Sequence, residues 1–371
     1  METWNPYRAL YLHIPFCKQR CKYCDFVTEA ISADNPILDQ YVERMIGQIR
    51  QYSNDDVLGA IETVYIGGGT PSFLGNKRLS SLLYALSISM HLTPEVECTL
   101  EVNPESVTSA MVKDLFALGV TRISMGVQSF NDAVLQTLGR IHTSDKARAA
   151  IRCVQERFEN ISIDLMCGLP GQTLEMFKTD VQEAVSLGTK HISIYPLTIE
   201  EGTPFSALYD AGKLEFDEDL SATCMDWAAG YLTEQGLNRY EVASYAYPGY
   251  ESRHNQAYWQ GIPYLGIGHG AVSMRQNDFC RERFSEDDGV IESLDSFQMA
   301  AEDLMLGMRM SKGISDEFLE WASILLPEAP EAFASLEDEG YIVHQAARWM
   351  PTHKGWLFGN HLYGRILELA F

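Results

Sequence analysis

Short apolar, β-branched runs alternate with stretches of helical periodicity over the first 200 residues. The runs are continuously apolar, which is typical of parallel strands covered on both faces. They occupy 9–15, 63–66, 96–102, 122–127, 161–166 and 191–196. Between them, apolar side chains recur at helical spacing in 37–49, 79–86, 111–118 and 174–185. Asn35 is expected to cap the first helix, with Pro36 at its first position.

Six strands that alternate with helices predict an α/β fold with a parallel sheet. The periodicity leaves two arrangements open, an open doubly wound sheet and a partial barrel. In both, ligands collect beyond the carboxyl ends of the strands. The alternation stops near residue 215, one more strand is possible over 238–247, and the pattern from residue 296 onward is mainly helical.

Composition and charge narrow the class of protein. The 371 residues are 46% hydrophobic and 21% charged, as in ordinary globular domains. The formal net charge of −23 repels phosphate backbones and disfavours nucleic-acid binding. Residues 281–340 hold 16 acidic and 4 basic side chains, which we interpret as a solvated surface. The chain has neither a transmembrane-length apolar run nor a signal-like start, so we expect a cytoplasmic protein without encoded membrane association.

Three of the eight cysteines form a C-x3-C-x2-C motif, Cys17, Cys21 and Cys24, directly after the first predicted strand. Three thiolates on one short loop can hold three irons of a cubane cluster and leave the fourth iron open to an amino acid. The alternatives are a zinc site completed by His13 and a chance triplet. Zinc usually takes ligands from paired knuckles, and no second pair is present. The scattered cysteines are expected to be small buried residues: Cys98, Cys153, Cys167, Cys224 and Cys280.

The segment Tyr11–Cys17, YLHIPFC, leads into a cysteine motif with an aromatic residue before its last cysteine. This pattern resembles the oxygen-independent coproporphyrinogen III oxidase-like family of the radical S-adenosylmethionine (radical SAM) superfamily, which includes the oxidase HemN and the haem chaperone HemW. The resemblance implies a partial (β/α)6 barrel with an extra C-terminal, mainly helical module. It also implies a [4Fe-4S] cluster on the three cysteines, with S-adenosyl-L-methionine on the unique iron.

The same resemblance suggests how the chain is divided. Residues 1–215 are expected to form the partial barrel and 216–290 an extension of it. Residues 291–371 are expected to form a HemN-like module that is helical or a small winged fold.

Polar residues in or after successive predicted strands are candidates for one shared cleft. A glycine triplet follows the second strand, and carboxyl or amide side chains occur in or at the ends of the next three. Carboxylates suit ribose hydroxyls and an arginine suits a carboxylate. The resemblance implies S-adenosylmethionine contacts from Tyr11, Tyr23, Gly68, Gly69, Thr70, Glu101, Gln128, Arg140 and Asp164.

Three features favour the HemW type over the oxidase. The barrel pattern begins at about residue 7, whereas the oxidase carries an N-terminal extension. Phe26 stands where the oxidase motif has a further cysteine. Residues 254–259 read HNQAYW and match an H-N-x-x-Y-W motif associated with haem binding. The haem candidates are therefore His254, Asn255, Tyr258 and Trp259, with Arg253 placed to meet a propionate.

The histidines keep alternative interpretations. His254 offers an axial nitrogen for haem iron, but a buried hydrogen-bonding histidine would give the same pattern. His269 is either a second haem-ligand candidate or a loop histidine.

The sequence thus predicts a HemW-like protein that binds the cluster, S-adenosylmethionine and haem, and delivers haem to an acceptor protein. The alternatives are a coproporphyrinogen III oxidase, another radical SAM enzyme, and a non-enzymatic electron-transfer protein. Whether S-adenosylmethionine is cleaved stays open, and no catalytic residue is assigned. Lys18, Arg20 and Lys22 around the cysteine motif are expected to receive a flavodoxin- or ferredoxin-type electron donor.

Overall fold

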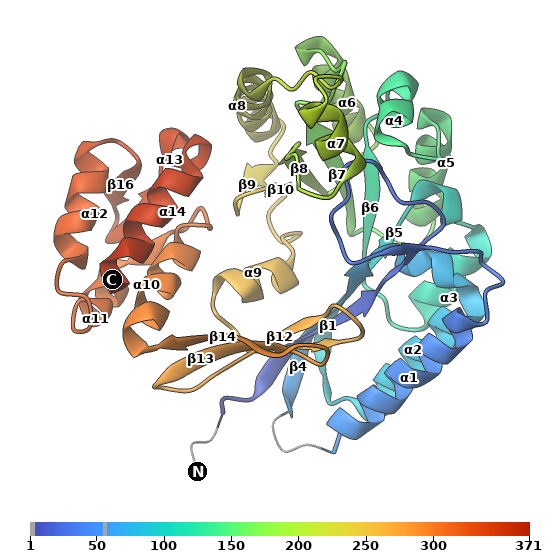
Figure 1. Ribbon diagram of the computed structural model, residues 1–371, viewed down its shortest axis with the longest axis horizontal. Coiled ribbons are helices and arrows are strands. Elements are labelled where there is room, and N and C mark those ends of the chain that lie inside the picture. Colours follow the sequence, from blue (N-terminus) through green and yellow to red (C-terminus); the bar gives the residue numbers. More distant parts are fainter. Residues whose placement is uncertain (1–3, 55–57) are drawn as a thin grey trace.

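The computed structural model describes residues 4–54 and 58–371. Six parallel strands form the middle of a curved sheet (Figure 1), and each of the six predicted strands is confirmed. They lie side by side in chain order, without the reversal that defines a doubly wound sheet. The fold is therefore a partial barrel, built from β1 (Tyr7–Ile14), β4 (Leu58–Gly68), β5 (Leu92–Val102), β6 (Arg122–Gln128), β7 (Ile161–Cys167) and β8 (His191–Pro196).

Helices cover the outer, convex face of this sheet (Figure 1). They are α1 (Ile37–Tyr52), α2 (Gly75–Ser89), α3 (Ser109–Ala117), α4 (Asp132–Leu138), α5 (Ser144–Gln155) and α6 (Leu174–Ser186). The side chain of Asn35 accepts a hydrogen bond from the amide of Ile37 at 3.0 Å. Pro36 precedes the first helical residue instead of occupying it, so the predicted start of α1 is wrong by one position.

The inner face of the barrel is polar. The prediction that the strands are apolar on both faces is therefore wrong for this face. In β7, Ile161, Ile163 and Leu165 belong to the hydrophobic core. The intervening Ser162 hydrogen-bonds with His191 of β8 at 2.8 Å, and Asp164 accepts from Ser124 of β6. All these side chains are largely shielded from solvent, so the strands are covered on both faces. The outer face is covered by apolar packing, and the inner face by polar side chains that hydrogen-bond with one another.

The sheet extends beyond the barrel on both sides to twelve strands. Next to β1 come β11 (Tyr264–Ile267), which is parallel to it, and then antiparallel β12 (Val272–Gln276), β13 (Cys280–Ser285) and β14 (Gly289–Asp295). Next to β8 come β10 (Ser244–Ala246) and β9 (Asn238–Arg239), so the single strand predicted over 238–247 is wrong. The strands β11–β14 were not predicted.

Short elements complete the barrel: β2 (Phe16–Cys17), β3 (Glu29–Ala30), η1 (Pro71–Leu74), η2 (Pro104–Ser106), α7 (Pro204–Asp210), α8 (Glu218–Glu234) and α9 (Arg253–Trp259). Helix α9 contacts β4 on the inner side of the sheet (Figure 1). Ser252 caps it, and the Glu97 carboxylate accepts hydrogen bonds from the backbone amides of Arg253 and His254 at 3.0 Å.

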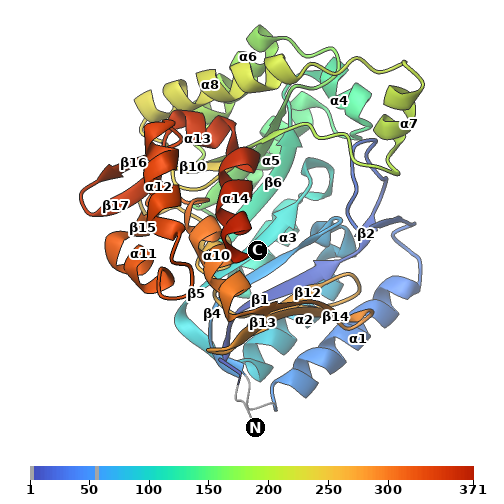
Figure 2. The same cartoon turned by 60° about the vertical axis from the view of Figure 1, so that its left-hand side comes forward.

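The C-terminal residues build a module with its own core, facing the open side of the barrel (Figures 1 and 2). It contains α10 (Ser296–Gly307), β15 (Ile314–Ser315), α11 (Asp316–Ala322), α12 (Ala329–Asp338), β16 (Ile342–Gln345), β17 (Arg348–Pro351), α13 (His353–Leu357), α14 (Gly359–Leu367) and η3 (Glu368–Ala370). Trp259 of α9 packs against this core, so the barrel and the module share a hydrophobic contact.

The scattered cysteines only partly follow the prediction. Cys98, Cys167 and Cys224 are buried, as predicted, whereas Cys153 and Cys280 are half-buried, so the prediction is wrong for these two. Within residues 4–54 and 58–371, no helix has both the length and the apolar character needed to cross a bilayer.

Candidate functional site

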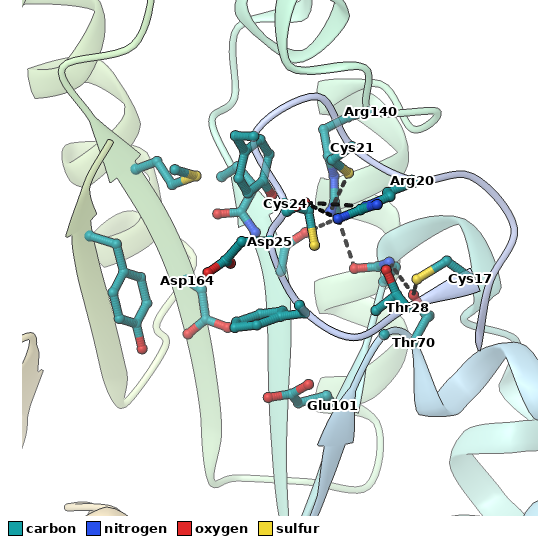
Figure 3. Close-up of a pocket in the computed structure, with 18 of the residues that line it drawn as sticks. Cys17, Arg20, Cys21, Cys24, Asp25, Thr28, Thr70, Glu101, Arg140 and Asp164 are labelled. Carbon is teal, nitrogen blue, oxygen red and sulfur yellow. Dashed lines mark hydrogen bonds between the residues drawn. The ribbon is translucent and has the colours of Figure 1, made fainter. Parts of the chain in front are cut away.

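A cavity of about 340 Å³ opens at the carboxyl ends of the parallel strands. The cysteine loop forms one side, and the Glu101 and Asp164 carboxyl groups lie on the side of the strands (Figure 3). Eight of the nine residues expected to contact S-adenosylmethionine line it together with Cys17, Cys21 and Cys24. These eight are Tyr23, Gly68, Gly69, Thr70, Glu101, Gln128, Arg140 and Asp164. Tyr11 is not among the lining residues, and its hydroxyl donates to Nδ1 of His13 at 3.0 Å.

Backbone and side-chain hydrogen bonds anchor the cysteine loop. The amide of Lys22 donates to the carbonyl of Leu138 at 3.0 Å, and Nε2 of Gln19 donates to the carbonyl of Gly139 at the same distance. Arg20 donates to the carbonyl of Cys24 from both Nε and Nη2. The loop is thus attached to the α4–α5 connection, which also carries Arg140.

A chain of hydrogen bonds joins two of the cysteines across the cavity wall (Figure 3). The Cys17 thiol lies 3.4 Å from the Thr70 hydroxyl, to which Nδ2 of Asn103 donates at 2.9 Å. Arg140 donates to Oδ1 of Asn103 at 2.7 Å and reaches the sulfur of Cys21 at 3.6 Å. Sequence reasoning missed Asn103, although its position directly after the strand that bears Glu101 was a usable signal.

The glycine triplet allows the backbone to approach the cysteine loop. A Cβ atom at Gly69 would lie 2.8 Å from the carbonyl oxygen of Phe16 and 3.0 Å from the sulfur of Cys17. Gly68 has a φ of 112°, and its amide donates to Oε2 of Glu101 at 3.1 Å. A side chain at either position would displace the loop or strain the backbone.

The donor set suits an iron–sulfur cluster better than a single ion. Across the part of the chain that the structure describes, no three His, Cys, Asp or Glu side chains converge to hold one metal ion. Both ring nitrogens of His13 are engaged, with Tyr11 and with the carbonyl of Val27, so His13 does not complete a zinc site here. A four-iron cluster offers a separate iron to each thiolate. Burial raises the pKa of Cys17 to about 11, so cluster binding must displace a proton there.

Two half-buried carboxyl groups face the cavity. Glu101 accepts a hydrogen bond from the Tyr65 hydroxyl at 2.8 Å, and burial raises its pKa to about 7. Burial also raises the pKa of Asp164, against the opposing charge of the buried Arg122. Because carboxylates accept hydrogen bonds strongly, this pair is suited to the two hydroxyl groups of a ribose.

Gln128 ends β6 in a strained conformation. Its φ of 70° lies in the left-handed region, and the pairing of β6 with β7 shifts register at this residue. A non-glycine residue in this region costs about 1–3 kcal/mol and is characteristic of functional sites. The resulting bulge places Gln128 in the cavity wall.

The pKa of Glu101 predicts a pH dependence for nucleoside binding. Below about pH 7 the carboxyl group is protonated and accepts hydrogen bonds poorly, so affinity for S-adenosylmethionine should fall by up to about tenfold per pH unit. Above pH 7 the affinity should level off. Calorimetric Kd values for the reconstituted protein between about pH 6 and 8 test this. The variant Glu101→Gln should show a flat profile, and an unchanged slope in this variant would assign the titration to another group.

The H-N-x-x-Y-W motif lies on α9, and its side chains point to two different sides of the helix. His254 is 1% exposed, and its ring nitrogens hydrogen-bond with Thr63 at 2.9 Å and with Tyr258 at 3.1 Å. Burial lowers its pKa to about 3, so the ring is neutral. An axial ligand needs a free ring nitrogen, and here both are engaged. Asn255 and Trp259 instead line a second cavity, on the side of the C-terminal module.

The other histidine and arginine candidates lie elsewhere. His269 is in the loop between β11 and β12, where Nδ1 lies 2.9 Å from the Asp287 carboxylate. Arg253 donates to the carbonyl of Glu95 at 2.6 Å.

Comparison with known proteins matches residues 11–184 to the radical SAM superfamily. Over 378 aligned residues the chain is 33% identical to "Heme chaperone HemW" of Lactococcus lactis, covering 97% of both chains. It is also 33% identical to "Heme chaperone HemW" of Escherichia coli K12, covering 96% of this chain and 97% of the relative. The chain belongs to the HemW family of the radical SAM superfamily. The resemblance inferred from the cysteine motif is thereby confirmed.

The fold of this HemW family member is also that of a solved relative. The E. coli coproporphyrinogen III oxidase HemN, described as a radical SAM enzyme, superposes with a TM-score of 0.80. The match covers 98% of this chain and 90% of HemN at 20% identity. It confirms the partial barrel with its C-terminal module.

Proposed function

We propose that this chain holds a [4Fe-4S] cluster on Cys17, Cys21 and Cys24, binds S-adenosylmethionine beside it, and carries haem to an acceptor protein. The observation that supports this most is the convergence of the three cysteines and eight nucleoside-site candidates on one cavity. Haem is proposed as the cargo because the chain is similar over its full length to proteins named as haem chaperones.

We assign roles within the cavity from the chemistry of the residues that line it. The amides of Gly68 and Gly69 donate to Glu101 and to the carbonyl of Ile14, so their carbonyls are the groups proposed to accept from the methionine amino group. Glu101 and Asp164 are proposed to accept from ribose hydroxyls. Arg140 fixes the loop through Cys21 and presents positive charge to the methionine carboxylate. When bound, the cluster supplies an electron to the sulfonium of S-adenosylmethionine.

An electron donor is expected to dock on the cysteine loop. Lys18, Arg20 and Lys22 are exposed there, and Phe26 beside them is 61% exposed. These exposed cations and the exposed aromatic ring on one loop suit an acidic flavodoxin or ferredoxin, despite the net charge of −23. We place this exchange in the cytoplasm.

Anaerobic reconstitution tests the function. The protein should bind about four irons with sulfide per chain, bind S-adenosylmethionine, and take up haem that it passes to an apo-acceptor. Incubation with coproporphyrinogen III and S-adenosylmethionine should yield no protoporphyrinogen. Formation of protoporphyrinogen would instead support the oxidase alternative, and stoichiometric zinc without sulfide would contradict the cluster.

A further inference from the structure

A second cavity of about 570 Å³ lies between the barrel and the C-terminal module. Strands β8 and β9, the turn between β9 and β10, and helices α8 and α9 border it on one side, and α13 and the turn after α10 on the other (Figure 1). Tyr195 and Pro196 line this cavity as well as the one that holds the cysteines. The two cavities therefore share a wall, and the volume is within the range of small-molecule sites.

Two arginines without acidic partners line this second cavity. Arg239 comes from β9 and Arg309 from the turn after α10. Among the described residues, neither forms an ion pair with a carboxylate, whereas the nearby Arg281 and Arg283 both do. In a chain with a net charge of −23, two uncompensated guanidinium groups at one cavity indicate an anionic ligand.

Aromatic rings hold both arginines in place. The guanidinium of Arg239 lies 4.3 Å from the ring centre of Trp356, and that of Arg309 lies 5.1 Å from the ring centre of Trp259. Stacking engages the face of a guanidinium and leaves the N–H groups at its edge for hydrogen bonds. Arg239 donates from Nε and Nη2 to the carbonyls of Glu241 and Val242, and Arg309 donates from Nε to the sulfur of Met305. Within the described part of the chain, this leaves Nη1 of Arg239 and both terminal nitrogens of Arg309 for a carboxylate. The two indoles also provide flat apolar surface in the cavity wall.

The acidic groups of the cavity do not neutralise this charge. Glu241 is 1% exposed and accepts a hydrogen bond from Nε1 of Trp259 at 3.1 Å. Burial raises the pKa of Glu241, which favours its neutral form. Glu218 is exposed at the first turn of α8.

We infer that this second cavity is a tetrapyrrole site, in which Trp259 and Trp356 contact the macrocycle and Arg239 and Arg309 bind its two propionates. The inference rests on the proposed function, because haem is the cargo assumed. It divides the H-N-x-x-Y-W motif into two parts. Asn255 and Trp259 line the site, while His254 and Tyr258 fix α9 against β4 and are positioning residues.

The test measures binding of three probes to the reconstituted full-length protein by difference absorption: haemin, iron-free protoporphyrin IX, and protoporphyrin IX dimethyl ester. The variants Arg239→Gln and Arg309→Gln should each lower the affinity for haemin and for protoporphyrin IX by about tenfold or more. The dimethyl ester cannot form the ion pairs, so its affinity should be the same in both variants and in the unmodified protein. Arg309→Lys keeps the charge and should restore most of the affinity.

Arg365→Gln, which removes a half-buried arginine of the C-terminal module, is the matched control and should leave all three affinities unchanged. Unaltered iron content and thermal unfolding show that a variant is folded. Haemin binding that survives in the double variant Arg239→Gln/Arg309→Gln, or that is lost in Arg253→Gln instead, overturns the site but not the chaperone function. Absence of haemin binding by the unmodified protein overturns the proposed function itself.

Discussion

Alanine at Cys17, Cys21 or Cys24 is expected to reduce the iron content of the reconstituted protein from about four per chain to less than one. Each thiol is one of the three proposed protein ligands, and among the described residues that line the cavity there is no fourth cysteine to replace a lost thiolate. Iron and sulfide analysis together with the visible spectrum measure this loss. S-adenosylmethionine binding should fall with it, because the open iron is one of its anchors.

The remaining cysteines provide the controls. Cys153→Ala and Cys280→Ala change half-buried cysteines that do not line the cavity and should keep the full cluster. A cluster retained in full by Cys21→Ala, or lost in Cys153→Ala, would mean that the ligand assignment is wrong.

Removal of Arg281 is expected to destabilise the protein by about 3–5 kcal/mol. This arginine is 1% exposed and donates to Oε2 of Glu302 at 2.5 Å and to Oδ1 of Asp303 at 2.6 Å, joining β13 to α10. Arg281→Met removes the cation that pairs with the largely shielded carboxylates of Glu302 and Asp303. The pKa of Asp303, which burial already raises against the charge of Arg281, should then rise further, so the deficit should grow as the pH increases through that pKa and shrink in mild acid. Urea unfolding followed by circular dichroism at about pH 5 and pH 8 measures the effect.

An exposed ion pair of the same module gives the comparison. Arg365→Met breaks a contact of 3.2 Å with Glu339 and should change stability by no more than about 1 kcal/mol. The triple variant Arg281→Met/Glu302→Gln/Asp303→Asn removes the charges together and should recover part of the loss. Equal urea midpoints for Arg281→Met and Arg365→Met would show that the ion pairs of Arg281 do not stabilise the contact between β13 and α10.

The barrel and its cavity were predictable because local signals and topology agree. Each parallel strand carries a row of core residues such as Ile161 and Ile163, and β5, β6 and β7 each also carry a polar residue within the strand or at its end. The carboxyl ends of neighbouring parallel strands meet at one edge, so Glu101, Gln128 and Asp164 had to lie close together. The spacing of Cys17, Cys21 and Cys24 gave the chemistry independently of the strands.

The extension and the second cavity could not be predicted, because their determinants are tertiary. Strand β14 is almost entirely exposed, so its residues lack the apolar run of a barrel strand and depend on pairing with β13. Arg239 and Arg309 are 70 positions apart in the sequence. Only the docking of α10 and α13 opposite β9 makes them neighbours, and neither belongs to a recognisable motif.

The position of β1 in the sheet has a consequence for biosynthesis. This strand pairs with β4 on one side and with β11 on the other, and Tyr264 of β11 lies about 250 residues after Ile14. At about 5–20 residues per second, a ribosome needs tens of seconds to deliver the second partner. During that interval one edge of β1 remains available for pairing with other chains. The cysteine loop then follows a strand that still lacks its second neighbour, β11. Loading of iron and sulfur should therefore follow synthesis of β11 and should not begin as soon as the cysteine loop has been translated.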